Sequence, residues 1–279
     1  MAIKIGIRAH DLCEKQTPET LASRLEEHGF SYVQLVFNKA LAPYSYEDAF
    51  VDKVAASLKE KKIQVAMLGA YFNPVHSDPE VVKKGIENFK ANLRIAHAFG
   101  HPYVGSETGS YNDSPWIYNP KNQTEEGYQQ SKKAFVELTR YAEEIGEDIT
   151  IEGAWGHVMY APKVLKRLVD ELHSPRVHVT LDLYNYLYEG NFESRDAIFK
   201  EACDLFKDEI KILHLKDAKL VDGKLVQVAP GQGDFHYSTM LETIKNECPN
   251  AVLVFEGVKG DDIDTSYRYM KSLISTKSM

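Results

Sequence analysis

The chain has 279 residues, of which 43% are hydrophobic and 27% are charged, a composition typical of a folded globular protein rather than a disordered one. Its 33 Lys and Arg residues stand against 41 Asp and Glu residues, for a formal net charge of −8, and this acidic balance argues against binding to the phosphate backbone of nucleic acid. The N-terminal segment lacks a long apolar run, so the sequence predicts no signal peptide or membrane anchor.

Short β-rich segments alternate with amphipathic helical segments along the chain. The sequence predicts strands at residues 3–8, 32–37, 63–68, 103–106, 149–152, 177–183, 210–215 and 251–255, and helices at residues 17–29, 46–61, 78–98, 124–145, 161–172, 194–206, 237–246 and 264–274. Thr17 and Ser194 are the expected N-caps of two helices. The alternation predicts an α/β fold, a parallel sheet closed into a (β/α)8 TIM barrel. No linker interrupts the pattern, so residues 1–279 are interpreted as a single domain.

The two kinds of loop differ in length. Links from helix to strand are brief, as at residues 146–148, whereas the links from strand to helix at residues 70–78 and 107–123 are long. Barrel enzymes build their sites at the C-terminal ends of the strands, and we expect the site there. The 107–123 loop carries Tyr111, Trp116 and Tyr118, whose rings are expected either to stack on a bound sugar as a lid or to pack on the barrel rim.

Four later strands end in residues that can bind a metal ion, namely Glu152, Asp182, His214 and Glu256. Successive side chains of a strand face opposite sides of a sheet, and each of these residues lies opposite an apolar set. A closed barrel would therefore aim all four at one point. Three carboxylates and one imidazole favour Mn²⁺ or Mg²⁺ and leave Zn²⁺ and Co²⁺ open, so one divalent ion is predicted. The alternative is four separate buried polar groups with local hydrogen bonds.

The residues around these strand ends form a family pattern. It comprises IEGAW at 151–155, TLDLYN at 180–185, HLKD at 214–217, GQG at 231–233 and FEG at 255–257. Over essentially the whole chain this order resembles the xylose-isomerase-like TIM-barrel superfamily, which includes sugar isomerases, ketose 3-epimerases, inosose dehydratases and family-2 apurinic-site endonucleases. By this resemblance Glu152 and Glu256 are both metal ligands and the catalytic acid/base pair. Such a site would move a proton through a metal-stabilised enediolate.

The sequence departs from the ketose 3-epimerase pattern at substrate-binding positions. Asn185 stands where those enzymes usually have a histidine, Leu220 where they usually have an arginine, and Val158 where many have a second glutamate. The metal site is therefore retained while the substrate contacts differ. The resemblance does not imply ketohexose specificity.

Four residues are candidates for substrate contact. His157 follows the strand that carries the first glutamate, Asn185 lies just beyond the metal-binding aspartate, and Lys216 shares the inward parity of the metal-binding histidine. Loop capping by the first two, and pairing of Lys216 with a core carboxylate, are the alternative roles. Arg8, at the end of the first strand, is expected either to hold an anionic group such as a sugar phosphate or to form a structural ion pair.

The sequence thus predicts a divalent-metal-dependent isomerase or epimerase of a small sugar, polyol or sugar phosphate. A lyase or dehydratase on the same metal site is an alternative, because it also begins with proton removal beside a carbonyl. An apurinic-site endonuclease would need further ligands on earlier strands, and the third strand ends without a histidine at Leu68-Gly69-Ala70. A non-catalytic sugar-binding barrel is the remaining alternative.

The expected partner is a small-molecule sugar or sugar phosphate. Nucleic acid is disfavoured, no membrane is expected, and a homo-oligomer is left open. The cysteines Cys13, Cys203 and Cys248 are odd in number and far apart in the sequence. Such a set favours reduced thiols in a cytoplasmic protein.

Overall fold

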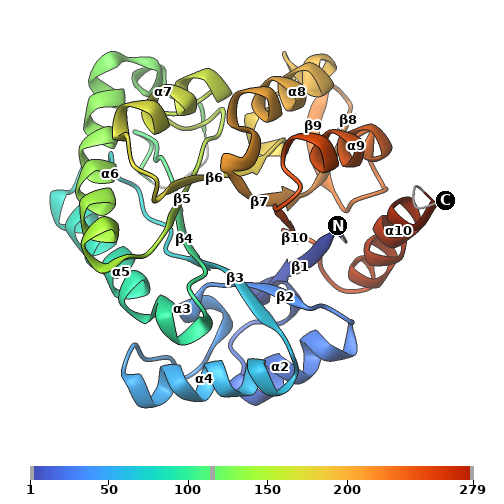
Figure 1. Ribbon diagram of the computed structural model, residues 1–279. Coiled ribbons are helices and arrows are strands. Elements are labelled where there is room, and N and C mark those ends of the chain that lie inside the picture. The colour runs from blue at the N-terminus through green and yellow to red at the C-terminus, as the bar shows by residue number, and fades with distance from the viewer. Residues whose placement is uncertain (1–2, 114–116, 277–279) are drawn as a thin grey trace.

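Figure 1 shows the computed structural model, which describes residues 3–113 and 117–276. Parallel strands close into a barrel in the order β1-β10-β7-β6-β5-β4-β3-β2. The strands are β1 (Lys4–Arg8), β2 (Tyr32–Leu35), β3 (Gln64–Gly69), β4 (Tyr103–Glu107), β5 (Ile149–Glu152), β6 (Val177–Asp182), β7 (Ile210–Leu215) and β10 (Val252–Phe255). The predicted (β/α)8 TIM barrel is confirmed.

Helices surround the barrel on the outside (Figure 1). The main ones match the predicted helices and are α2 (Pro18–Glu27), α4 (Asp48–Glu60), α5 (Pro79–Ile95), α6 (Glu125–Ile145), α7 (Pro162–Leu172), α8 (Arg195–Phe206), α9 (Tyr237–Glu247) and α10 (Asp262–Thr276). Thr17 Oγ1 accepts the backbone N–H of Thr20 at 3.3 Å, as expected of an N-cap. Ser194 makes no side-chain cap hydrogen bond, and that prediction is wrong because a 3-10 turn, Phe192–Ser194, leads into α8 instead.

Several short elements that the sequence did not predict lie in the loops. They are the helices α1 (Ala9–Leu12) and α3 (Phe37–Ala40) and the 3-10 turns η1 (Ala96–Phe99), η2 (Pro120–Gln123), η3 (Tyr184–Tyr186), η4 (Phe192–Ser194) and η5 (Lys207–Glu209). The helices α1 and α3 follow the adjacent strands β1 and β2 at the C-terminal end of the barrel. They therefore place His10 and Lys39 at the mouth.

The core has two parts because helices cover the outer face of the sheet while its inner face lines the barrel. Outward-facing strand residues such as Ile7, Ile151 and Leu213 pack with the helices in one large cluster. A smaller cluster fills the barrel and consists of Ala66, Met67, Ile212, Val252 and Val254. The apolar cluster surrounds one buried polar pair, Thr150 and Thr180, whose hydroxyls are hydrogen-bonded at 2.9 Å, and the charged residues lie at the C-terminal ends of the strands.

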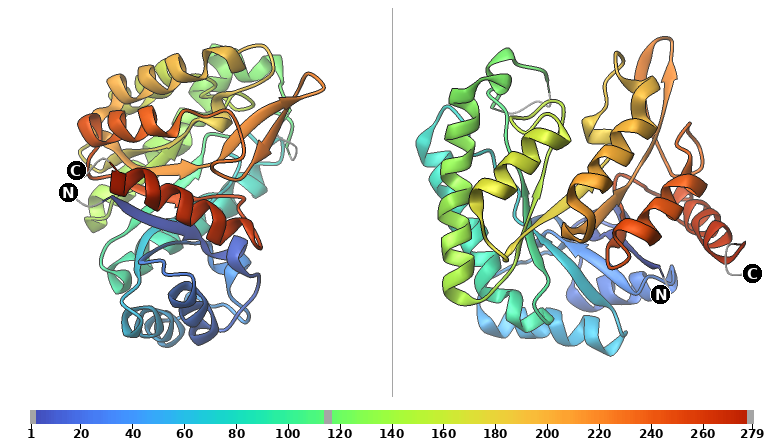
Figure 2. Two further views of the ribbon diagram at one scale, coloured as in Figure 1. Left: turned by 90° about the vertical axis from the view of Figure 1, so that its right-hand side faces the viewer. Right: turned by 45° about the horizontal axis from the view of Figure 1, so that its top comes forward.

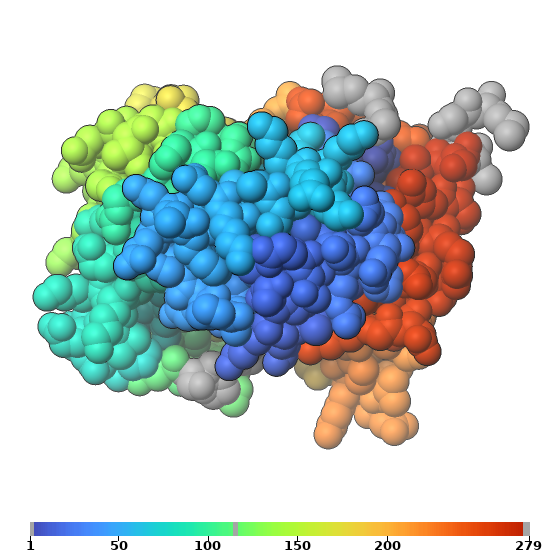
Figure 3. All heavy atoms as spheres, turned by 90° about the horizontal axis from the view of Figure 1, so that it is seen from below, coloured from blue at the N-terminus to red at the C-terminus, as the bar shows by residue number. Residues whose placement is uncertain are grey.

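An antiparallel hairpin leaves the barrel after β7, where the sequence analysis placed no strand. It consists of β8 (Asp217–Val221) and β9 (Lys224–Val228) and projects beyond the rest of the surface (Figures 2 and 3). The Asp217 carboxylate at its root accepts backbone N–H groups at 2.8–3.1 Å, from Ala218, Gly231, Gly233 and Phe235. One carboxylate therefore ties the hairpin to the turn that leads into α9.

The tertiary structure brings two of the three free cysteines together. Cys203 on α8 and Cys248 after α9 are buried, and a hydrogen bond between their thiols raises the pKa of Cys203. Within the described residues, no helix combines the length and the apolar character needed to cross a membrane.

Asp217→Asn should lower the free energy of unfolding by about 2 kcal/mol, because an amide cannot accept all of these backbone N–H groups and some of them lose their partner in a buried setting. Chemical denaturation monitored by circular dichroism measures the change. The matched control is Asp222→Asn at the exposed hairpin turn, which should stay within about 0.5 kcal/mol of the parent protein. Equal stability of the two variants would contradict the structural role of Asp217.

Candidate metal centre and active site

Strand alternation brings a polar side chain to the inner C-terminal end of nearly every barrel strand. These residues are Arg8, Gln34, Glu107, Glu152, Asp182, His214 and Glu256, on β1, β2, β4, β5, β6, β7 and directly after β10. Neighbouring strands place them in register, as Glu107 lies beside Glu152 and Asp182 beside His214. The barrel mouth therefore has a polar and strongly charged floor.

Glu152, Asp182, His214 and Glu256 lie at the centre of this floor. One ligand atom of each lies within 4.8 Å of the others, and all four residues are buried. His214 Nδ1 lies 2.7 Å from Glu256 Oε2, 3.3 Å from Glu152 Oε1 and 3.5 Å from Asp182 Oδ2. The structure thus brings together the four residues that the sequence analysis proposed as metal ligands.

Gln34 fixes the orientation of the His214 imidazole. His214 Nε2 lies 2.7 Å from Gln34 Oε1, and Gln34 Nε2 donates to the Tyr71 hydroxyl at 2.7 Å. Because an amide oxygen only accepts hydrogen bonds, His214 Nε2 carries a proton, and Nδ1 is the atom that can bind a cation. Partners of this kind orient the ligating histidines of metal sites.

Lys216 and Asn185 hold the carboxylates in place. Lys216 Nζ lies 2.7 Å from Asp182 Oδ2 and donates to Asn185 Oδ1 at 3.0 Å. Asn185 Nδ2 in turn donates to Glu152 Oε1 at 2.7 Å. Lys216 therefore takes its alternative role of pairing with a core carboxylate, and because both residues also line the cavity, their contact with substrate stays a prediction.

Arg8 forms the structural ion pair that was one of its two predicted roles. Its Nε and Nη2 donate to the Asp11 carboxylate at 2.8 and 2.9 Å, and its Nη1 donates to Glu256 Oε1. Asp11 Oδ2 also accepts the backbone N–H of Gly257 at 2.7 Å. The guanidinium is therefore committed to positioning Glu256 where β1 meets β10.

The surroundings shift the pKa values of the glutamates in different directions. Burial raises the pKa of Glu152, and burial together with the nearby Glu152 carboxylate raises the pKa of Glu107 well above its usual value. Burial also acts on Glu256, but the charges of Lys216 and His214 outweigh it and hold the pKa of Glu256 well below its usual value. The two central glutamates thus lie in contrasting electrostatic environments.

The donor set fits one divalent cation. Glu152 Oε2 is buried and has no hydrogen-bond partner in the described part of the chain, an arrangement that is costly unless a cation satisfies the oxygen. Burial would lower the pKa of His214, yet the carboxylates of Glu256 and Glu152 outweigh it and raise that pKa well above its usual value. The cluster therefore attracts positive charge, and its oxygen-rich set with one imidazole suits Mn, Mg, Zn or Co.

A cavity of about 390 Å³ opens beside the cluster and is lined by one of its members, Glu256. Every residue of its lining carries a polar side-chain group, and the lining consists of Arg8, His10, Lys39, Tyr71, Glu107, Tyr184, Asn185, Lys216, Gln227 and Glu256. A cavity of this size and character suits a small molecule with many hydroxyl groups.

Sequence reasoning missed Gln34, Glu107 and Gln227. The same alternation that identified the four central residues applies to β2 and β4, where Gln34 and Glu107 have the inward parity, so these two could have been found. Gln227 lies on β9 and donates to the backbone oxygen of Glu256 at 3.2 Å. The sequence feature that could have revealed this hairpin is the Asp222-Gly223 pair, which is typical of a two-residue hairpin turn.

His157 is not among the described residues that line the cavity. It lies in the loop after β5 with 4% of its surface exposed, and burial lowers its pKa to about 3. The loop folds the residue inward because Ala154 accepts the His157 backbone N–H at 2.9 Å and donates to Met159 at 3.1 Å. The lining of the cavity therefore gives no support to its predicted contact with substrate.

Rings from three loops stack on one another at the barrel rim. Tyr118 stacks on Trp155 with ring centroids 5.7 Å apart, and Trp155 stacks on Tyr188 at 4.0 Å. The Tyr111 hydroxyl donates to Gln130 Oε1 at 2.8 Å. These contacts agree with rim packing, the second of the two roles predicted for the 107–123 loop, and Trp116 lies outside the described residues.

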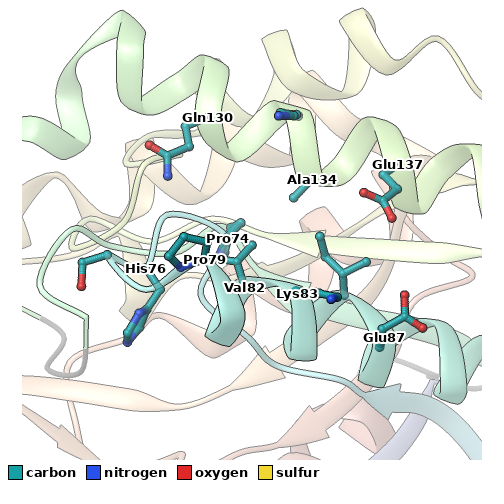
Figure 4. Close-up of a pocket in the computed structure, with 12 residues that line it drawn as sticks. Pro74, His76, Pro79, Val82, Lys83, Glu87, Gln130, Ala134 and Glu137 are labelled. Atoms are coloured by element: carbon teal, nitrogen blue, oxygen red, sulfur yellow. The ribbon is translucent and has the colours of Figure 1, made fainter.

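A second pocket, of about 400 Å³, lies on the outer wall between α5 and α6 (Figure 4). Its labelled lining residues include Pro74, His76, Val82, Gln130 and Glu137. It shares no lining residue with the central cavity. We therefore place the candidate site at the barrel mouth.

Together, the fold and the cluster define a (β/α)8 barrel with a candidate metal centre at its C-terminal mouth. A family model described as xylose isomerase-like TIM barrel matches residues 22–273. The chain belongs to this family, which confirms the resemblance inferred from the strand-end motifs. No curated protein sequence matches the chain.

Solved structures share the fold at low sequence identity. A D-tagatose 3-epimerase-like protein has a TM-score of 0.79 and 17% identity, with 99% of this chain and 100% of that one covered. The IolI protein with a bound zinc atom has a TM-score of 0.75 and 20% identity over 98% and 99% of the two chains. The 3-keto-D-glucoside 4-epimerase of E. coli has a TM-score of 0.73 and 15% identity over 98% and 99%.

Gln34→Leu should weaken divalent metal binding by about 10- to 100-fold, because His214 loses the partner that fixes its ring. Isothermal titration of the purified protein with Zn²⁺ and with Mn²⁺ measures the affinity. Gln16→Leu replaces another buried glutamine, whose amide donates to the Cys13 carbonyl, and should leave the affinity unchanged. Wild-type affinity in a folded Gln34→Leu protein would show that Gln34 does not orient the ligand.

Proposed function

We propose that the chain is a divalent-metal-dependent isomerase or epimerase of a small sugar, polyol or sugar phosphate. One observation carries the proposal: a buried cluster of three carboxylates and one imidazole has its ligand atoms within 4.8 Å of one another, and one of its members, Glu256, lines a cavity at the barrel mouth. Sugar epimerases are among the solved structures that share the fold over nearly the whole chain.

Glu152, Asp182, His214 Nδ1 and Glu256 would hold the cation. When bound, the ion would supply a Lewis acid that polarises a substrate carbonyl and so acidifies the neighbouring C–H. The cluster is the only group of this kind in residues 3–113 and 117–276, and it offers one metal position. This agrees with a single-metal isomerase rather than with the trinuclear zinc site of an apurinic-site endonuclease.

Proton transfer is assigned to Glu152 and Glu256. They lie at the ends of β5 and β10, which are separated in the barrel by β6 and β7, so the two carboxylates approach a bound molecule from different sides. One would remove the proton beside the carbonyl and the other would return it. Lys216, Asn185 and Arg8 keep both carboxylates in place through the contacts described above.

The first test is metal content per chain, for protein purified without chelator and for Asp182→Asn. About one Mn, Mg, Zn or Co per chain is expected in the parent protein, with a clear loss in the variant because one ligand is weakened. Close to three zinc ions per chain would favour the endonuclease. An absence of metal after reconstitution would overturn the proposal.

The second test is turnover in Glu152→Gln and Glu256→Gln. Exchange of solvent deuterium into a panel of sugars and sugar phosphates should fall by about 100-fold or more in either variant, because an amide cannot accept the proton, and metal binding should weaken while the fold persists. Glu147→Gln is the matched control, since Glu147 is buried and precedes β5 at the opposite end of the barrel. Full exchange activity in either the Glu152 or the Glu256 variant would contradict the proposed proton transfer by these two residues.

A further inference from the structure

The charged residues that line the cavity are unevenly distributed. The carboxylates of the cluster come from β5, β6 and the end of β10, whereas His10 and Lys39 come from α1 and α3 on the β1–β2 side. These two short helices contact each other, and their strands are neighbours in the barrel. Within this lining Glu107 and Glu256 are the carboxylates and Lys39 is a cation on the β1–β2 side, in a protein whose formal net charge is −8.

Lys39 is a cation without a carboxylate partner. Its side chain is exposed and lines the cavity, and it forms no ion pair with any residue in the described part of the chain. The ammonium group of Lys39 is thus available to a molecule in the cavity.

His10 provides a second, independent sign of a ligand. Its Nδ1 is buried and has no hydrogen-bond partner among the described residues, although buried polar atoms are normally satisfied. Burial and the charge of Arg8 lower the pKa of His10 to about 4, so the ring is neutral near pH 7 and has one N–H to donate. Arg8 lies nearby, with its charge paired to Asp11 and Glu256.

We infer that His10 and Lys39 form a subsite for one acidic group of the substrate, a phosphate or a carboxylate. The substrate is then a small polyhydroxy carbonyl compound whose acidic end lies on the β1–β2 wall while its carbonyl end lies over the cluster. Two carboxylates line the cavity. Glu107 on β4 is separated from β2 by β3, and Glu256 is paired with Arg8. This inference rests on the proposed function and narrows its substrate class.

The test is calorimetric titration of the metal-loaded full chain with ligand pairs that differ in charge. One pair is a 2-ketopentose and its 5-phosphate, and the other is a 2-ketohexose and the corresponding 2-ketohexuronate. At least one acidic member should bind about 10-fold or more tightly than its neutral partner, and Lys39→Ala should remove that difference. Which pair shows it distinguishes phosphate from carboxylate.

Three controls separate the subsite from other effects. Lys39→Arg should retain the preference, and Lys84→Ala, at an exposed lysine of α5, should leave it unchanged. Metal content should be equal in all lysine variants. Equal affinity for acidic and neutral members, no binding of either acid, or a preference that survives Lys39→Ala would overturn the inference.

Deuterium exchange into the same ligands separates this inference from the proposed function. If deuterium exchanges into neutral sugars and acidic ligands bind no more tightly, the proposed isomerase function is supported and the His10–Lys39 subsite is contradicted. If an acidic ligand binds in a way that depends on Lys39 but no ligand exchanges deuterium, the subsite is supported and the proposed isomerase function is contradicted.

Discussion

Burial of several carboxylates at one point is the constraint on which the rest of the site depends. Glu152, Asp182 and Glu256 converge on His214 Nδ1 within 3.5 Å, and such charges repel one another and lose their hydration. The chain offsets this cost with cations from other strands, because Lys216 and Arg8 both reach the cluster. A bound divalent cation would offset the remaining repulsion between the carboxylates.

The supporting contacts also link the site to the closure of the barrel. Arg8 on β1 reaches Glu256 after β10, and Asp11 binds both Arg8 and the backbone of Gly257. Gln34 on β2 holds His214 on β7 across the interior. The first and last strands are thus joined by the same residues that orient the candidate ligands, so stability of the barrel and geometry of the centre depend on each other.

The residues above the cluster differ from those that define it. The central four are the residues that the strand-end motifs predicted as metal ligands, and the chain belongs to the xylose isomerase-like TIM barrel family. Around them Asn185 supports Glu152, and the hairpin of β8 and β9 contributes Gln227 to the cavity wall. In barrels of this kind the loops and strand ends around the site can vary without a change of fold, so the fold alone does not fix the substrate.

The sequence by itself determined the order of strands and helices, the barrel and the four central residues, because strand alternation and helix periodicity are local patterns that a closed barrel converts directly into inward and outward faces. Strand alternation, applied to β2 and β4, also predicts that Gln34 and Glu107 face the barrel interior. Only the tertiary structure decided which partners these side chains take. It turned Arg8 toward Asp11 and Glu256, buried His157, brought Cys203 to Cys248 and set His10 beside Lys39. Such contacts join residues from separate loops, whose relative positions depend on packing that no local pattern encodes.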